Sequence, residues 1–331
     1  MMIIFNSHYL KREITGLGRY TRQLHATLCK HNVINVHPVS ILYRNRYIRF
    51  ISIFMYELIG PFLIRLKHKN AIHISPAFSC AAFAKAADIV VIHDLAFLEY
   101  PEKYTNLEKL YFKFNCYLLS KSPCKIVTPS TYVKNQLINK LGIKEARIHQ
   151  ISPYSEFSGS DRAENNYFIL LSNAHPRKNI SNVVNAFSCS DAAACGFRLI
   201  VVGNFDYTVD VGISNLEFIK GLDDDNLQSL LRHSSALLLF SYSEGFGYPV
   251  IEAASLGVPS LTSNVTSLNE LMSDVEGNKS CLTVVEIQTK INMFLHDNEY
   301  RKKLKTHTKI LNNRYSKSIF VAKWRKLLNE Y

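Results

Sequence analysis

The chain has 331 residues, of which 47% are hydrophobic, and a formal net charge of +12. This length accommodates two domains, and this hydrophobic content excludes a largely disordered protein. The seven cysteines are odd in number and form no C-x-x-C pair, which argues against a disulfide framework and a zinc site and favours a reducing cytoplasm. Residues 1–7 lack the features of a secretory signal peptide and are expected to form a buried strand.

The positive charge is concentrated in the first half of the chain. Residues 1–155 contain 21 Lys or Arg and 8 Asp or Glu, a net charge of +13, whereas residues 156–331 have a net charge of −1. Such asymmetry indicates an anionic partner: phospholipid, nucleic acid or a pyrophosphate-bearing acceptor. We expect no nucleic acid, because the aromatic residues are not interleaved with the basic ones as a base-stacking surface requires.

Apolar segments alternate with helical patterns through most of the chain. The expected strands are 2–6, 34–39, 71–75, 88–92, 125–128, 147–151, 167–172, 197–203, 216–219, 235–240 and 258–262. The expected helices are 18–31, 107–120, 131–141, 179–189, 223–233, 249–256, 285–296, 299–312 and 316–329. This alternation predicts an α/β fold with two Rossmann-like parallel-sheet domains, joined near residues 152–160 and facing a cleft.

The loop before the first expected helix contains two closely spaced glycines, in the sequence Thr-Gly-Leu-Gly-Arg-Tyr that begins at Thr15. Gly16 and Gly18 permit close backbone approach, and the start of a helix favours a phosphate group. A tight turn without a ligand explains the same pattern equally well.

Residues 44–69 combine basic ends with an apolar centre. The apolar run 50–64 contains Glu57, Gly60 and Pro61 and is shorter than the roughly 20 residues that a membrane-spanning helix needs. Two interpretations remain: a basic amphipathic helix in the membrane interface, or a core helix with solvated charged ends. The flanking cations are Arg44, Arg46, Arg49, Arg65, Lys67 and Lys69.

Two candidate groups follow expected strands. His93 and Asp94 end the strand 88–92, where a lone histidine is usually structural, although it could contact a ligand at this edge. Arg177 and Lys178 follow the strand 167–172 and could neutralise a diphosphate. A solvated cationic turn is the structural alternative for this pair.

The segment 244–252, Glu-Gly-Phe-Gly-Tyr-Pro-Val-Ile-Glu, is the most informative in the chain. It predicts a strand, a glycine turn and a helix, with Glu244 before the turn and Glu252 in the helix. The helix start offers amides to a phosphate, and each carboxylate could accept hydrogen bonds from hydroxyls. This arrangement suits a sugar nucleotide, whereas the structural alternative is a buried turn whose acids complement the helix dipole.

With the following Ala-Ala-Ser-Leu-Gly-Val-Pro, this segment closely resembles the signature of the retaining glycosyltransferases of family 4. The loop 15–22, His93 and the Arg177-Lys178 pair occur in that family's order. The resemblance implies the two-Rossmann-domain GT-B fold. The expected domains are an acceptor- and membrane-side domain 1–155, a donor domain 156–314 and a last helix 315–331 that crosses back to the first.

The implied reaction is transfer of a sugar from a nucleotide diphosphate donor to a hydroxyl, with retention at the anomeric carbon. Lys178 and Arg177 would stabilise the departing diphosphate, Glu244 would position sugar hydroxyls, and His93 would contact the sugar. The expected donor-binding residues are Gly16, Leu222, Gly245, Phe246, Gly247, Tyr248 and Glu252. Many family members carry a second phosphate-binding cation, an arginine, where this chain has Ser172. That role therefore falls to Arg177 or to another residue.

The resemblance is greatest to bacterial mannosyltransferases of surface polysaccharide (O-antigen-type) synthesis. It implies GDP-mannose as donor and a lipid-pyrophosphate-linked saccharide as acceptor, with the basic half on the anionic inner face of the cytoplasmic membrane. Because the two cations can replace a divalent ion, we expect no metal and no cofactor besides the donor. The alternatives are a UDP-sugar, a soluble acceptor, a nucleotide-sugar-binding partner subunit without turnover, and a sugar-nucleotide epimerase.

Overall fold

The computed structural model describes residues 1–11, 15–37, 46–159, 162–172, 175–203, 215–276 and 280–329. Arg44, Ser160 and the last two residues of the expected strand 34–39 lie outside these residues. The chain divides into two compact units, one of Met1–Pro153 with Val321–Tyr331 and one of Tyr154–Phe320. This boundary falls two residues before the expected one, and the end of the last helix groups with the first unit.

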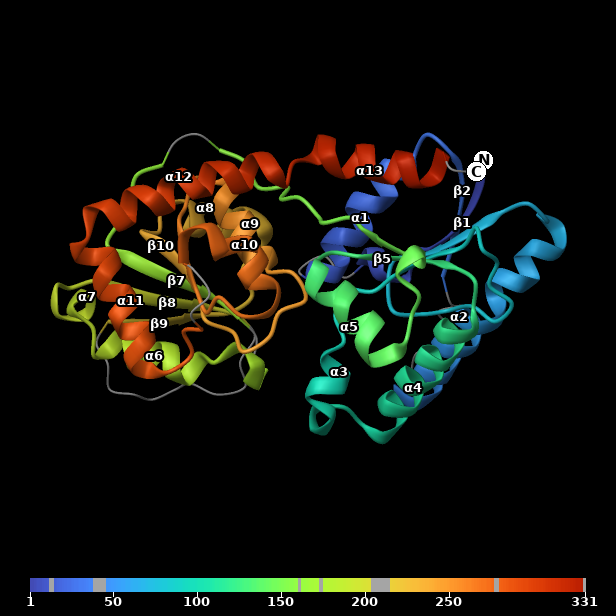
Figure 1. The fold of residues 1–331 in the computed structure, drawn as a ribbon, viewed down its shortest axis with the longest axis horizontal. Helices are drawn as coiled ribbons and strands as arrows, with labels where there is room; N and C mark the ends of the chain where they lie inside the picture. The colour runs from blue at the N-terminus through green and yellow to red at the C-terminus, as the bar shows by residue number, and fades with distance from the viewer. Residues whose placement is uncertain are drawn as a thin grey trace. The chain divides into compact units, whose positions relative to one another are not determined.

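The first unit contains a six-stranded sheet in the order β2-β1-β3-β4-β5-β6, with every pairing parallel among the described strands. The strands are β1 (Met2–Asn6), β2 (Asn32–Val36), β3 (Ile72–Ser75), β4 (Ile89–Val91), β5 (Lys125–Thr128) and β6 (Ile148–Gln150). The helices are α1 (Gly16–Leu28), α2 (Arg46–Lys67), α3 (Ala96–Glu99), α4 (Asn106–Lys121) and α5 (Thr131–Leu141). Figure 1 shows α2 and α4 as two long helices of this unit.

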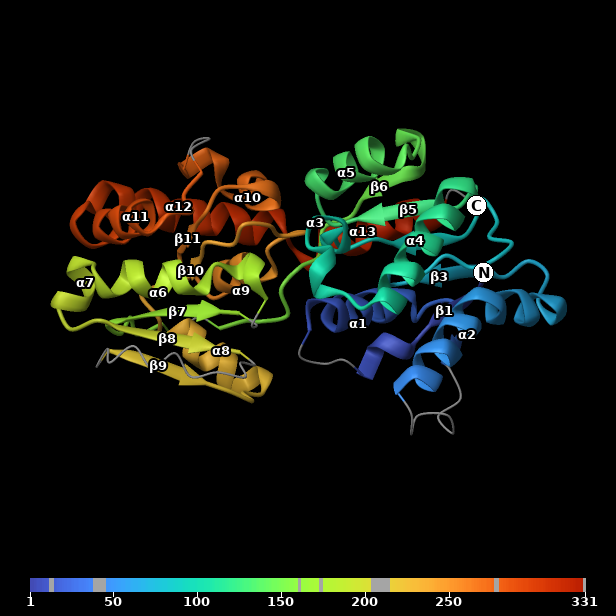
Figure 2. The same cartoon turned by 90° about the horizontal axis from the view of Figure 1, so that it is seen from below.

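The second unit contains a five-stranded sheet in the order β11-β10-β7-β8-β9, again parallel. The strands are β7 (Tyr167–Leu171), β8 (Arg198–Val202), β9 (Leu216–Ile219), β10 (Ala236–Leu239) and β11 (Ser260–Thr262). The helices are α6 (Ile180–Ser188), α7 (Asp191–Ala194), α8 (Asp224–Arg232), α9 (Tyr248–Ser255), α10 (Thr266–Glu276), α11 (Val284–His296) and α12 (Asn298–Arg314). Helices lie on both faces of this sheet (Figure 2), as its fully buried, apolar strands β7 and β10 require.

Local sequence explains where several helices begin. Thr105 and Glu108 form a reciprocal capping box at the start of α4, and Ser130 caps α5 through the amide of Val133. Gly142 ends α5 with a φ of 63°, a backbone conformation that favours glycine. These local residues satisfy the amides and carbonyls at helix ends without tertiary contacts, so such helix ends can be predicted from the sequence.

The last helix, α13 (Lys317–Asn329), has an apolar stripe that is buried as expected. Trp324 is fully buried, and Leu327 and Leu328 are each 3% exposed. The basic residues of this helix lie mainly on its solvent side. Among the residues that the structure describes, no helix is long and apolar enough to cross a membrane.

All eleven expected strands are present, with ends that differ by a few residues. One longer helix was not in the expected set, namely α10, which begins at Thr266, a residue with a left-handed φ of 52°. Both interpretations of residues 44–69 expected a helix there, and it is α2, which contains Pro61, a residue that removes one helix hydrogen bond.

Candidate active site

A buried ion pair between Lys178 and Glu244 forms the centre of the candidate site. The Lys178 Nζ lies 2.6 Å from the Glu244 Oε1, and the two side chains are only 11% and 8% exposed. Sheet order explains the contact: β7 and β10 are parallel neighbours, and these residues follow their carboxyl ends. The structure therefore brings together two predicted residues that are 66 positions apart.

The ionisation of Glu244 is controlled by this pair. Burial alone would raise the pKa of its carboxyl group, but the positive charges of Lys178 and Arg177 outweigh burial and hold the pKa below its ordinary value. Ser241 adds a hydrogen bond from its hydroxyl to the same Oε1 at 2.7 Å. Glu244 is consequently a carboxylate at neutral pH, with Oε2 making no hydrogen bond to any described residue.

Arg177 and Lys178 lie in a short 3₁₀ turn, Pro176–Lys178, rather than in a helix. The His175 side chain accepts a hydrogen bond from the Arg177 amide at 3.2 Å. The Arg177 carbonyl accepts one from the Tyr242 amide at 2.7 Å. This backbone bond connects the cationic turn directly to the Glu244 loop and fixes their separation.

The start of helix α10, which follows β11, supports Glu244 and was not identified from the sequence. The Glu244 amide donates to the Thr266 Oγ1 at 3.1 Å, and the Ser267 hydroxyl donates to the Glu244 carbonyl at 2.8 Å. Thr266 has a φ of 52°, a strained conformation for a β-branched residue. Serine and threonine are common at helix starts, so no sequence signal distinguished these two as supports for a carboxylate.

Gly247 makes the turn into α9 possible. Its φ is 104°, and a Cβ atom there would lie 2.8 Å from the Leu268 Cδ2. Both the backbone conformation and the packing therefore require glycine. Glu252 lies one turn further along α9 and is 4% exposed, so the structure positions it on the helix predicted from the sequence.

The other predicted donor residues of this unit are more enclosed than their proposed role led us to expect. Gly245, Phe246 and Gly247 are buried, and the Phe246 ring packs edge-on against Tyr248 and Tyr315 at centroid distances of 6.0 and 5.3 Å. Leu222 is partly buried against the same core. Phe246 thus has a packing role, and contact between the donor and the turn amides stays a prediction.

In the first unit, the structure brings His93 next to the helix that begins at Gly16. The rings of Tyr20, on α1, and His93 meet edge-on at 4.8 Å. Thr15 caps α1 by accepting a hydrogen bond from the Gly18 amide at 3.1 Å. Gly16 is the first residue of α1, where helix amides lack partners within the helix.

His93 is held as a neutral imidazole. Burial lowers the pKa of its ring below the ordinary value, despite the opposing effect of a hydrogen bond to a carbonyl. Its Nε2 lies 2.8 Å from the Pro76 carbonyl oxygen, which can only accept, so Nε2 carries the proton. Nδ1 is therefore the ring's hydrogen-bond acceptor.

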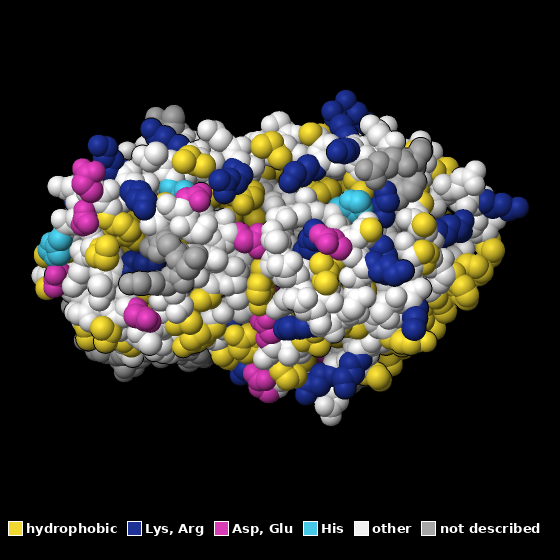
Figure 3. Space-filling view, viewed as in Figure 1, with side chains coloured by type: hydrophobic (Ala, Val, Ile, Leu, Met, Phe, Trp, Pro, Cys, Tyr) yellow, Lys and Arg dark blue, Asp and Glu magenta, His cyan; other side chains and the backbone are white. Residues whose placement is uncertain are grey.

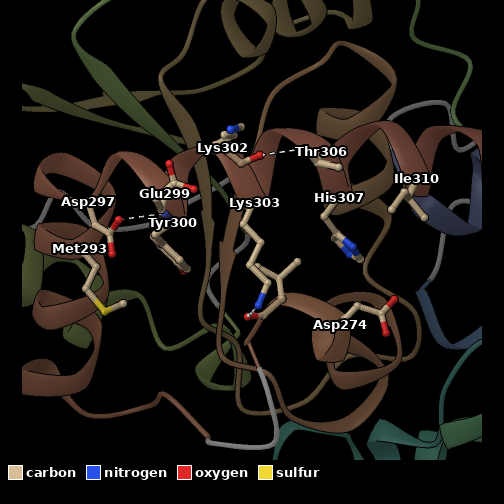
Figure 4. Close-up of a pocket in the computed structure, with 11 residues that line it drawn as sticks. Asp274, Met293, Asp297, Glu299, Tyr300, Lys302, Lys303, Thr306, His307 and Ile310 are labelled. Carbon is tan, nitrogen blue, oxygen red and sulfur yellow. Dashed lines mark hydrogen bonds between the residues drawn. The ribbon is translucent and has the colours of Figure 1, made fainter.

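A separate pocket of about 630 Å³ lies in the second unit and contains none of the predicted site residues. It is lined by residues of α10, α11 and α12, including Asp274, Lys303 and His307 (Figure 4). The Lys303 Nζ donates to the Val275 carbonyl at 3.0 Å and the His307 Nε2 lies 2.7 Å from the Leu271 carbonyl oxygen, so both side chains already bind the protein backbone. Within the described ranges, no three His, Cys, Asp or Glu side chains cluster as a metal site, and metal independence stays a prediction.

Comparison with known proteins identifies the second unit. Residues 155–310 match the model of the family "Glycosyl transferases group 1". These residues are a group 1 glycosyl transferase domain. The resemblance to glycosyltransferases that residues 244–259 carry is thereby confirmed for this domain.

Two curated relatives are named as mannosyltransferases. The O-antigen chain mannosyltransferase B of Escherichia coli is 24% identical over 354 residues, which cover 91% of this chain and 92% of the relative. The O-antigen chain mannosyltransferase RfbU of Salmonella typhimurium is 27% identical over 199 residues, 56% of this chain. That match spans about half of the length of RfbU, 54%.

Solved structures confirm the fold. A sucrose-phosphate synthase from Thermosynechococcus elongatus superposes with a TM-score of 0.77 at 13% identity, covering 100% of this chain and 98% of its own. WaaG, a glycosyltransferase involved in lipopolysaccharide biosynthesis, superposes with a TM-score of 0.71 at 12% identity, covering 99% and 98%. The predicted GT-B architecture of two parallel-sheet α/β domains is therefore correct.

Proposed function

We propose that this protein is a retaining glycosyltransferase that moves a sugar from a nucleotide diphosphate donor to a hydroxyl of a lipid-linked saccharide. The observation that carries the proposal is the buried Lys178–Glu244 pair in the glycosyl transferase domain. A lysine and a carboxylate held 2.6 Å apart in a polar loop offer a cation to a phosphate and an acceptor to sugar hydroxyls at one place.

Each member of the pair has capacity beyond the bond between them. An ammonium group has three N–H donors, and among the described residues Lys178 uses one of them, on Glu244. In the proposal the remaining donors bind the diphosphate, and Glu244 Oε2 accepts hydrogen bonds from the sugar. The pair itself then sets the distance between phosphate and sugar.

The difficult step is loss of the diphosphate from the anomeric carbon, which develops negative charge on the leaving group. Lys178 and Arg177 stabilise that charge from fixed positions, and fixed charges in a site of low polarity lower an activation barrier most effectively. The rigid support of Glu244 by Ser241, Thr266 and Ser267 fits this requirement. The two cations take the role of a divalent ion, so the proposed reaction is metal-independent.

GDP-mannose is the proposed donor, because two relatives, one matched over most of the chain and one over about half of it, are named as mannosyltransferases. The same names favour an O-antigen-type surface polysaccharide as the product. The proposed acceptor is a saccharide on a lipid pyrophosphate at the inner face of the cytoplasmic membrane. A UDP-sugar, a soluble acceptor, or a nucleotide-sugar-binding subunit without turnover are the alternatives that the experiment below separates.

The direct experiment is a thermal-shift screen of the protein against nucleotide diphosphate sugars, followed by measurement of nucleotide release with acceptor. Ligand that binds the native state raises the melting temperature. GDP-mannose should give the largest shift, and nucleotide release should depend on acceptor. A shift without release under any acceptor condition identifies a binding subunit, and a shift only with UDP-sugars replaces the donor assignment.

A further inference from the structure

Helix α2 presents an apolar stripe to solvent along its whole length. Figure 3 shows hydrophobic side chains along the lower right edge of the first unit, where Figure 1 places this helix. Isolated exposed apolar residues are ordinary, but residues repeating every three or four positions form a continuous face. The exposed members are Ile48, Ile51, Met55, Phe62, Leu63 and Leu66, between 38% and 62% accessible.

The opposite face of α2 is firmly attached to the unit. Glu57 is 4% exposed and accepts hydrogen bonds from Asn6 at 3.0 Å and from the Tyr111 hydroxyl at 2.8 Å. Arg65 forms a buried ion pair with Asp88. A helix with buried charges on one side cannot rotate to hide its apolar stripe without breaking these bonds, so the stripe is presented on a fixed support.

Phe83 extends this surface from a neighbouring loop. Its side chain is 77% exposed, and its ring lies 5.2 Å from that of Phe62. Its φ of 58° is a strained conformation for an aromatic residue. The Ala82 amide bonds the Leu58 carbonyl at 2.9 Å, which fastens the loop to α2 close to Pro61. The fold therefore holds an aromatic ring in solvent at an energetic cost, which is typical of functional positions.

The charges around this surface are positive. Lys67, Lys69 and Lys85 are exposed at its C-terminal end, where the Lys85 Nζ bonds the Lys69 carbonyl at 2.9 Å. On the adjacent helix α4, exposed Leu110 and Tyr117 alternate with exposed Lys113 and Lys121. The acids of these two helices are Glu57, which is buried, and Glu108, which caps α4. Apolar residues ringed by lysines complement an anionic lipid surface, which offers both acyl chains and phosphates.

We infer that the stripe of α2 together with Phe83 and the surrounding lysines is a docking surface for anionic lipid bilayers, with the Phe83 ring inserted at the interface. The inference deepens the proposed function, because it rests on a lipid-linked acceptor, and it specifies which residues bring the enzyme to that acceptor. Of the two interpretations of residues 44–69, it selects an interfacial helix.

Phosphatidylglycerol vesicles at low salt test the inference through Phe83→Asn. Asparagine tolerates a positive φ, so the variant should melt at the same or a higher temperature than the wild type. Its vesicle affinity should fall at least about tenfold, since a buried aromatic contributes that much or more to partitioning. A variant that melts lower and binds vesicles normally would show a purely structural Phe83 and overturn the inference.

The stripe and the charges are tested separately. The double variant Leu63→Ser, Leu66→Ser should bind vesicles at least about tenfold more weakly than the wild type. The control is the double variant Val285→Ser, Ile310→Ser in the second unit, where the two side chains are also exposed, at 69% and 45%. This control should bind vesicles like the wild type. Lys67→Glu with Lys69→Glu should abolish the preference for phosphatidylglycerol over phosphatidylcholine. Equal loss in both serine pairs would contradict the assignment of the surface.

Two further measurements separate lipid docking from a protein interface on the α2 stripe, and the docking surface from the proposed donor function. Sedimentation that shows a wild-type dimer and a monomeric Leu63→Ser, Leu66→Ser variant would make the stripe a protein interface and overturn the inference. The donor-induced thermal shift is measured on the same proteins, because it reports the second unit. Vesicle binding that is absent while the donor shift persists refutes the docking surface alone, and the reverse result refutes the proposed donor function alone.

Discussion

Replacing Lys178 with methionine tests the buried ion pair most sharply. The substitution keeps the aliphatic bulk and leaves Glu244, 8% exposed, without its closest cation. Breaking a buried pair by removing one partner costs about 3 kcal/mol or more. For a unit of this size we expect the melting temperature to fall by about 6–12 °C at neutral pH.

The effect of Lys178→Met on the melting temperature should depend on pH. In the wild type the pKa of Glu244 is below its ordinary value of 4.5, so the pair stabilises the fold above that pH and its contribution is lost as pH falls through the folded-state pKa. In Lys178→Met, burial instead raises the pKa of Glu244, and protonation relieves the penalty as pH falls. The difference in melting temperature between the two proteins should therefore shrink from neutral pH toward pH 4.5.

Thermal denaturation monitored by circular dichroism at several pH values is the assay. Lys309→Met, an exposed substitution on α12, is the matched control and should melt like the wild type. Adding Glu244→Gln to Lys178→Met should restore most of the lost stability and none of the turnover. A Lys178→Met protein that melts within a degree or two of the wild type at all pH values would refute the reasoning.

Three further outcomes are expected. Ser241→Ala removes the 2.7 Å hydrogen bond to Glu244 and should cost about 1.5–3 kcal/mol in unfolding free energy, measured by denaturant titration; a loss below about 0.5 kcal/mol would contradict the geometry. Gly247→Ala should destabilise the second unit and reduce the donor-induced thermal shift, because the new Cβ meets Leu268 and φ is 104°; wild-type stability would contradict the strain argument. Burial lowers the pKa of His73 to about 4, so the unfolded chain binds its proton first as pH falls below 6.5; stability should fall by about 2 kcal/mol between pH 6.5 and 5, a slope that His73→Gln should reduce.

The fold was predictable because its strands are short apolar runs separated by helical patterns. The sequence 236–239, Ala-Leu-Leu-Leu, is buried at every position, as a central parallel strand requires. Helix α10 was not predicted, because the left-handed φ of Thr266 at its start cannot be recognised from the sequence. Helix α2 was ambiguous, because an exposed apolar stripe and a buried one give the same periodicity in sequence.

The main residues of the site could be predicted from the sequence, but the residues that hold Glu244 in place could not. Glu244 and Lys178 follow strands whose adjacency depends on sheet order, which was not predicted; the family resemblance assigned both residues to one site. Thr266 and Ser267 contact the backbone of Glu244 through their side-chain hydroxyls, and such hydroxyls are too common at helix starts to mark a support for a carboxylate in the sequence. Phe246 illustrates the opposite case, where a residue inside a functional motif packs in the core.

Affinity for GDP-mannose, measured by calorimetry on the wild type and on Lys178→Ala, tests the central proposal most directly. If Lys178 binds the diphosphate, the variant should lose at least about tenfold in affinity, because a charge-assisted hydrogen bond contributes about 1.5–3 kcal/mol. Its affinity for free mannose should not change. Equal affinity of the two proteins for GDP-mannose, with the variant still folded, would contradict the account.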